Sequence, residues 1–310
     1  MKAFVCLAVL FSTFIGYIQA EKTEHTYRII SPVEHQVIQR DFSNTAWVEI
    51  KVVTVSPVSK SGPLEYRLDK NRSWEKANGE WKDERFVARL RVRAGGWHTI
   101  EVRDSRTPDH RSQGVQFGVG EVFVVAGQSN SGNYGEVKQS TQTGLVSAYD
   151  FENKKWQLAV DPQPGAGGRG GSIMPLLGDA LSKKLNLPIG IIAYGQGGTS
   201  VREWLPQGSR FPNPPTVENK VRKIYYGEWE SLGKIYPGFI ERMKAFGKNG
   251  FRAVLWHQGE SDANQKDPTR TLSGPLYEKY LTQLILKTRT DLEWDVPWFV
   301  AQATYHVPGD

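Results

Sequence analysis

Cysteine is almost absent from this chain. The 310 residues include one cysteine, Cys6, so no intramolecular disulfide can form, and a small disulfide-stapled domain is excluded. Cys6 lies in an N-terminal segment where Lys2 precedes an apolar stretch, Ala3–Ile18. This pattern predicts a cleaved secretory signal over residues 1–20. We therefore expect a secreted or periplasmic protein that is stabilised by the size of its core.

Long apolar runs are also missing after that signal. The mean hydropathy of −0.47 argues against an integral membrane protein, so no membrane contact is expected beyond residues 1–20. The net charge of +6 is spread along the chain, and Arg89, Arg91 and Arg93 alternate with apolar residues. Such alternation is typical of a solvated sheet face, and no nucleic-acid partner is expected.

A phosphate-binding lysine is missing from the one glycine-rich patch, Gly165–Gly171. Ser172-Ile-Met follows the patch, whereas a nucleotide-binding loop of this kind ends in lysine and a hydroxyl residue. The patch therefore predicts a flexible loop beside a pocket. No nucleotide, metal or other cofactor is expected.

Residues 21–118 have the pattern of an all-β domain. Apolar residues alternate in Phe86–Val92 and Trp97–Val102, with the turn Ala94-Gly-Gly96 between them. Further short strands are predicted at residues 27–30, 36–39, 46–53, 64–68 and 115–117. This number of strands predicts a small immunoglobulin-like β-sandwich.

Residues 119–310 have the pattern of an α/β domain. Strands are predicted at residues 122–126, 189–193, 251–256 and 297–303, a hairpin at 145–149 and 155–158, and helical spacing at 176–185, 232–243 and 277–285. Alternating strands and helices predict a mostly parallel sheet.

Three polar motifs follow three of these strands. They are Gly127-Gln-Ser-Asn130, Tyr194-Gly-Gln-Gly-Gly-Thr-Ser200 and Trp256-His-Gln-Gly-Glu-Ser-Asp262. The carboxyl ends of parallel strands meet at one edge of the sheet, where ligands bind in open α/β folds. The motifs together resemble blocks I, II and III of the SGNH (GDSL-like) hydrolases. More narrowly, they resemble the sialate O-acetylesterases and the acetylxylan esterases of carbohydrate esterase family 6.

This resemblance covers residues 119–310 and implies a three-layer α/β/α fold with a flavodoxin-like parallel sheet. It implies a serine esterase that removes O-acetyl groups from carbohydrates. Such an enzyme needs a nucleophile, a base, a group that orients the base, and donors for the oxyanion. Ser129 fits the nucleophile. The backbone N–H groups of Ser129 and Gly198, and the side-chain amide of Gln258, are expected to form the oxyanion hole.

The carboxylate of Glu260 has two readings. By the resemblance, either this carboxylate or an aspartate in a C-terminal Asp-x-x-His motif orients the catalytic histidine. Alternatively, Glu260 is a favourable charge at the start of a helix. The family's Asp-x-x-His motif does not occur after residue 262. His257 is expected to pack or to form a local hydrogen bond. His306 is expected to lie at the rim of the pocket or at the edge of the core, with the role of the base as the alternative. We therefore expect the sequence to be truncated at its C-terminus, with the catalytic histidine beyond residue 310.

Three residues are expected to bind the substrate. Asn130 would border the pocket, Arg202 would hold a carboxylate such as that of sialic acid, and Trp204 would stack on a sugar face. The alternatives are a surface salt bridge for Arg202 and ordinary packing for Trp204.

Two other functions are left open. A degenerate hydrolase domain with a β-sandwich would make a non-catalytic carbohydrate-binding protein. A lipase-like esterase would need a long apolar lid, and the polar, proline-rich segment 206–220 does not look like one.

Overall fold

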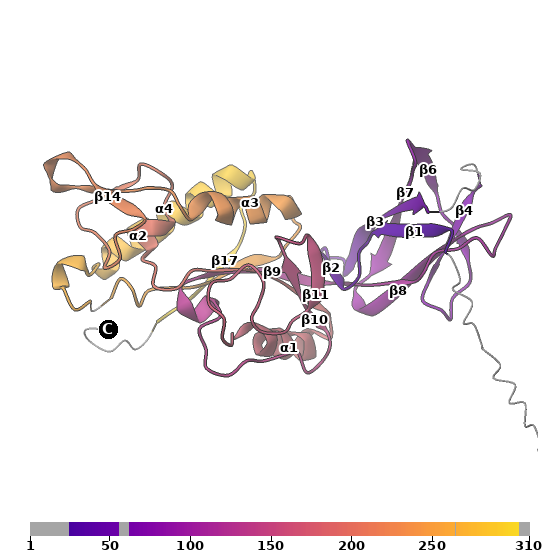
Figure 1. Cartoon of the computed structure of the whole chain (residues 1–310), viewed down its shortest axis with the longest axis horizontal. Helices are drawn as coiled ribbons and strands as arrows, with labels where there is room; N and C mark the ends of the chain where they lie inside the picture. Colours follow the sequence, from indigo (N-terminus) through magenta and orange to yellow (C-terminus); the bar gives the residue numbers. More distant parts are fainter. Residues whose placement is uncertain (1–24, 56–61, 264, 304–310) are drawn as a thin grey trace, which may run out of the picture.

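The computed structural model describes residues 25–55, 62–263 and 265–303, so the predicted signal and His306 lie outside the described residues. The chain forms a mixed α/β structure with one large mixed sheet, which confirms the predicted α/β class. Figure 1 shows the N-terminal strands at one end and the helices at the other. Within the described residues, no helix is long and apolar enough to cross a membrane.

The N-terminal part consists of two sheets that share one core. The first sheet has the order β1 (Tyr27–Ser31), β3 (Thr45–Thr54), β7 (Arg85–Arg93) and β6 (Gly79–Lys82). Facing it are β8 (Gly95–Asp104), β4 (Leu64–Leu68) and β5 (Glu75–Lys76), which belong to the large sheet. Buried residues such as Val48, Phe86, Ile100 and Phe117 pack in one cluster between the two sheets. Alternate residues of β3 and β7 face this core, which accounts for the alternation of apolar residues in the sequence.

One strand joins the two parts of the chain. Strand β9 (Val115–Gly127) runs through residues 118 and 119 without interruption. Every residue from Phe117 to Gly127 is buried. Its first half pairs with β8 and with β2 (Gln36–Gln39). Its second half pairs in parallel with β12 (Ile189–Gly195) and β16 (Ala253–His257). The two strands predicted at 115–117 and 122–126 are thus one.

The C-terminal part is built on parallel pairing around β9. The spatial order is β10 (Val146–Asp150), β12, β9, β16 and β17 (Trp298–Ala301), all parallel. Strand β11 (Lys155–Leu158) adds an antiparallel edge to β10, as predicted for the hairpin. Apart from the hairpin strands β10 and β11, the strands lie in the order β12, β9, β16 and β17. The first strand in the sequence, β9, therefore lies between the second, β12, and the third, β16. In sheets of this kind the order reverses beside the first strand, and ligands bind there.

Helices cover both faces of this sheet (Figure 1). Val122, Val124 and Ala126 of β9 share a buried cluster with α3 (Tyr236–Phe246) and α4 (Gly274–Leu292). Phe123 and Val125 point to the other face, where α1 (Met174–Leu185) packs. The three helices overlap the three predicted helical segments. Helix α1 carries proline in its first turn and ends at Asn186 in the left-handed conformation, as a helix boundary requires.

The connection between β12 and β16 adds small elements to the edge where the motifs lie. They are α2 (Val201–Trp204) and a three-stranded sheet of β13 (Arg210–Phe211), β15 (Trp229–Ser231) and β14 (Val221–Lys223). Short 3₁₀ helices occur at Ser129–Ser131, Tyr225–Gly227 and Pro268–Arg270.

Close packing of β9 gives a test of the fold. A Cβ atom on Gly120 would lie 2.0 Å from the carbonyl oxygen of Pro188, whereas one on Gly96 would meet nothing within 4 Å. We predict that Gly120→Ala lowers the free energy of unfolding by about 2 kcal/mol or more, because a backbone atom cannot easily move away. Gly96→Ala should leave it unchanged. Urea denaturation measures both, and equal stability of the two variants would contradict the packing described for β9.

Candidate active site

Backbone hydrogen bonds hold the three motif loops together. The N–H of Gln128 donates to the carbonyl of His257 at 2.9 Å, and the N–H of Gln196 donates to the carbonyl of Gly127 at 2.8 Å. The side-chain oxygen of Gln128 also accepts from the N–H of Ser261 at 3.0 Å. The three motifs therefore meet at one edge of the sheet, as their positions after parallel strands predicted.

Ser129 lies on a tight turn at the end of β9. Gly127 has a φ of 131°, and a Cβ atom there would lie 2.0 Å from the carbonyl oxygen of His257, so only glycine fits. Ser129 then begins a 3₁₀ turn, closed by the N–H of Gly132 donating to the Ser129 carbonyl at 2.9 Å. The serine is half-buried and lines a cavity of about 330 Å³.

Gly198 supplies a second backbone donor at this edge. It is exposed and has a φ of 67°, which glycine adopts readily. Within the described part of the chain, the N–H groups of Ser129 and Gly198 donate to no protein acceptor. Both donors are therefore unoccupied by the protein itself.

The side-chain amide of Gln258 has a different role from the one expected. Gln258 is buried, and its NH₂ group donates to the Asp262 carboxylate at 2.7 Å and to the Thr199 carbonyl at 3.0 Å. It also lies 3.2 Å from the side-chain oxygen of Gln128. With these acceptors in place, the amide links the three loops and has no hydrogen left for an oxyanion. The prediction that the Gln258 amide donates to the oxyanion is therefore wrong.

Glu260 is held by Asn130. The side-chain NH₂ of Asn130 donates to Oε1 of Glu260 at 2.7 Å, and Nε2 of His257 lies 3.8 Å from the same oxygen. The other oxygen, Oε2, is buried and has no hydrogen-bond partner among the described residues. A buried carboxylate oxygen without a donor is costly, so this atom marks a place where a donor is needed. Asn130, which was expected to bind substrate, thus contacts the carboxylate of the third motif.

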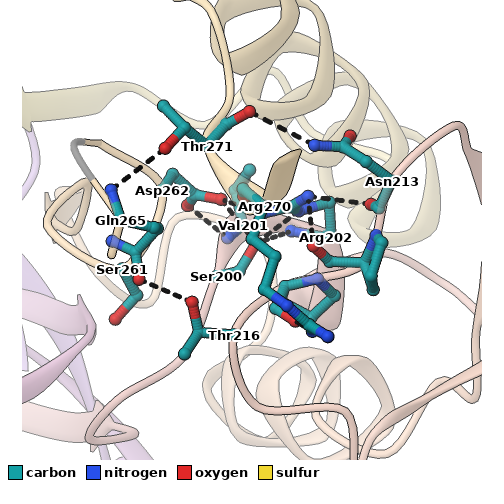
Figure 2. Close-up of polar contacts among 12 residues, drawn as sticks. Ser200, Val201, Arg202, Asn213, Thr216, Ser261, Asp262, Gln265, Arg270 and Thr271 are labelled. Carbon is teal, nitrogen blue, oxygen red and sulfur yellow. Dashed lines mark hydrogen bonds and ion pairs between the residues drawn. The ribbon is translucent and has the colours of Figure 1, made fainter. Parts of the chain in front are cut away.

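Arg202 is part of a buried network with Asp262 (Figure 2). Its side chain has no solvent exposure, and Nη2 lies 3.2 Å from Oδ1 of Asp262. The guanidinium also donates to the carbonyls of Asn213 at 2.8 Å and Arg270 at 2.7 Å. Burial lowers the pKa of Arg202, and the charge of Asp262 opposes that shift. A guanidinium so enclosed cannot reach a substrate, so the predicted substrate contact and its surface alternative are both wrong.

Asp262 also caps α2. It accepts from Ser200 Oγ at 2.5 Å and from the N–H of Val201 at 2.9 Å. Ser200 and Glu203 complete a capping box around the same turn. These contacts give Asp262 a structural role. The network therefore fixes the second motif to the third.

Trp204 lies in the core. Its side chain is fully buried, its Nε1 donates to Thr199 Oγ1 at 2.9 Å, and its ring meets Trp256 edge to face at 4.9 Å. A buried ring offers no face to a sugar, so the predicted stacking role is wrong and ordinary packing is its role.

A family model described as carbohydrate esterase, sialic acid-specific acetylesterase, matches residues 119–307. The chain belongs to this family. The search of curated proteins found no match.

Solved structures similar to this esterase family member share little sequence with it. A carbohydrate acetylesterase from Xanthomonas citri has 18% identity and a TM-score of 0.48, over 88% of this chain and 60% of its own. A protein from Arabidopsis thaliana has 20% identity and a TM-score of 0.40, over 58% and 73%. NanS has 17% identity and a TM-score of 0.35, over 60% and 68%. The chain thus spans 60% of the length of the Xanthomonas protein.

The glycine patch of this esterase family member is held in place, which corrects the expected flexible loop. The N–H of Gly167 donates to the Gly195 carbonyl at 2.8 Å, and the N–H of Gly171 donates to the Gly135 carbonyl at 2.7 Å. A Cβ atom on Gly171 would lie 1.9 Å from the carbonyl oxygen of Val137. The glycines therefore permit close backbone approach to the segment after Ser129, and the patch does border the cavity through Gly171.

Removing the charge of Asp262 tests the network. Asp262→Asn keeps the shape of the side chain but leaves the guanidinium of Arg202 buried without its counter-ion. We predict a loss of about 3–5 kcal/mol in the free energy of unfolding. Glu80→Gln is the control, because the Glu80–Lys82 pair is exposed, and its unfolding midpoint should not change. A wild-type midpoint for Asp262→Asn would show that the network is not needed for folding.

Proposed function

We propose that the protein is a secreted or periplasmic serine esterase that removes O-acetyl groups from carbohydrates. Its fold is proposed to be the three-layer SGNH hydrolase, residues 119–310, preceded by an immunoglobulin-like β-sandwich. The family match supports the substrate class. The observation that carries the proposal is Ser129 on its turn at the carboxyl edge of the sheet, where it lines a cavity and its neighbour Asn130 donates to the partly buried carboxylate of Glu260.

In the proposed reaction, Ser129 Oγ attacks the acetyl carbonyl carbon of the substrate. A base takes the serine proton and passes it to the departing sugar oxygen, which leaves an acetyl group on Ser129. Water, activated by the same base, then releases acetate. The N–H groups of Ser129 and Gly198 donate to the oxyanion, and their lack of protein acceptors supports this role.

Glu260 is the proposed partner of the catalytic histidine. Its Oε1 accepts from Asn130, and Oε2 is left for a histidine N–H. In this role Glu260 would correspond to the carboxylate that orients the base in serine hydrolases.

His257 is not the proposed base. It lies at the same edge of the sheet as Ser129. However, the distance of 3.8 Å between its Nε2 and Oε1 of Glu260 is too long for a hydrogen bond. The other described histidines, His25, His35, His98 and His110, precede β9 in the sequence. We therefore propose that the base follows β17 in the chain. The expectation that it lies beyond residue 310 stays a prediction.

Paired variants test these roles. In the full-length protein, we predict that Ser129→Ala lowers kcat for an acetyl ester at least about a thousandfold, because the covalent route is lost. His257→Ala should lower kcat less than about tenfold, since it would not transfer the proton. Both variants should melt near the wild-type temperature, because both side chains are partly exposed. Wild-type turnover in Ser129→Ala would refute the proposed function, and equal losses in both variants would make His257 the base.

A further inference from the structure

Tyr134 lines the same cavity as Ser129, and its ring packs against the backbone of several glycines. A Cβ atom on Gly197 would lie 2.4 Å from Cζ of Tyr134, and one on Gly132 would lie 3.1 Å from Cε2. One on Gly168 would lie 3.2 Å from Cδ2. One side of the ring therefore packs against the loops of the first two motifs and against the glycine patch. These glycines leave room for the ring where any side chain would displace it.

The rest of this ring is open to solvent. Tyr134 is 52% exposed, and among the described residues its hydroxyl makes no hydrogen bond and its ring makes no aromatic contact. An ordinary core tyrosine is buried and bonds its hydroxyl. Tyr134 instead presents part of an aromatic ring to the cavity that Ser129 also lines.

The cavity beside Ser129 is mixed in character. Val137, Ile173 and Leu176 line it with large exposed apolar side chains, while Gln139 and Ser172 add polar groups. Its volume of about 330 Å³ lies at the lower end of the range for small-molecule sites. Apolar side chains gathered around a nucleophile, with a few polar groups among them, are typical of a ligand site.

We propose that Tyr134 is the residue that positions the sugar of the substrate. The exposed part of its ring packs against the apolar C–H face of an O-acetylated pyranose, by dispersion and by exclusion of water. Polar groups at the border meet the sugar hydroxyls, and the acetyl group points to Ser129. This inference rests on the proposed esterase function and names the side chain that distinguishes a sugar ester from a simple one.

A long acyl chain is the competing occupant of this cavity. A flexible chain is best held in an enclosed apolar channel, whereas this cavity includes Gln139, Ser172 and the amide of Asn130. The Asn130 amide already donates to Glu260 and the Ser172 hydroxyl to Asp161. The side chain of Gln139 is the group that would lose water against an acyl chain without gaining a partner. The sugar is therefore the better fit.

The test compares two esters in the full-length protein. One is O-acetylated N-acetylneuraminic acid, a sialic acid, and the other is vinyl acetate, which has no ring. Acetate release gives kcat and KM. We expect Tyr134→Ala to lower kcat/KM about tenfold on the sugar ester, mainly through KM, and to leave the value for vinyl acetate unchanged. Tyr134→Phe keeps the ring and should keep the wild-type value on both.

Trp47→Ala is the matched control. Trp47 is 60% exposed, on β3 of the four-stranded sheet, and its loss should change neither ester. An unchanged kcat/KM for the sugar ester in Tyr134→Ala overturns the inference. So does an equal loss on both esters, or a loss that grows from vinyl acetate to vinyl butyrate and octanoate. Wild-type protein that hydrolyses neither ester would instead refute the proposed function, and the role of Tyr134 would fall with it.

Discussion

The site depends on one strand being buried on both faces and paired along both edges. Strand β9 has no exposed residue from Phe117 to Gly127. At its end, Gly127 packs so closely against the backbone of His257 that no side chain would fit between them. That approach brings the turn of Ser129 against the third motif. The position of Ser129 is thus set largely by sheet packing.

A buried polar network fixes the loops around this turn. Gln128, Gln258 and Asp262 link all three motifs, and Arg202 joins Asp262 to the long connection after β12. A buried ion pair of this kind adds little net stability, yet breaking it is costly, so it favours one loop arrangement over others. Such an arrangement holds the free N–H groups of Ser129 and Gly198 in fixed positions, as the proposed oxyanion hole would require.

Sequence patterns gave the fold more reliably than the contacts of single residues. Strand alternation and helical spacing depend on neighbours a few positions away, and the elements predicted from them were found with shifted ends. The short strands β5 and β6 were missed because their side chains are mostly exposed and show no alternation. Arg202 and Trp204 were misassigned because burial depends on distant partners. Those of Arg202 lie 60 and 68 residues along the chain, at Asp262 and Arg270.

Covalent labelling is the most direct test of the central claim, that Ser129 is an activated nucleophile at this edge. A fluorophosphonate reacts with an activated serine and leaves a stable adduct, which peptide mass spectrometry locates. In full-length protein that hydrolyses acetyl esters, the account predicts one adduct, on Ser129, and its loss in the presence of the acetylated sugar. An adduct on another residue, or full activity with no modified serine, would contradict it.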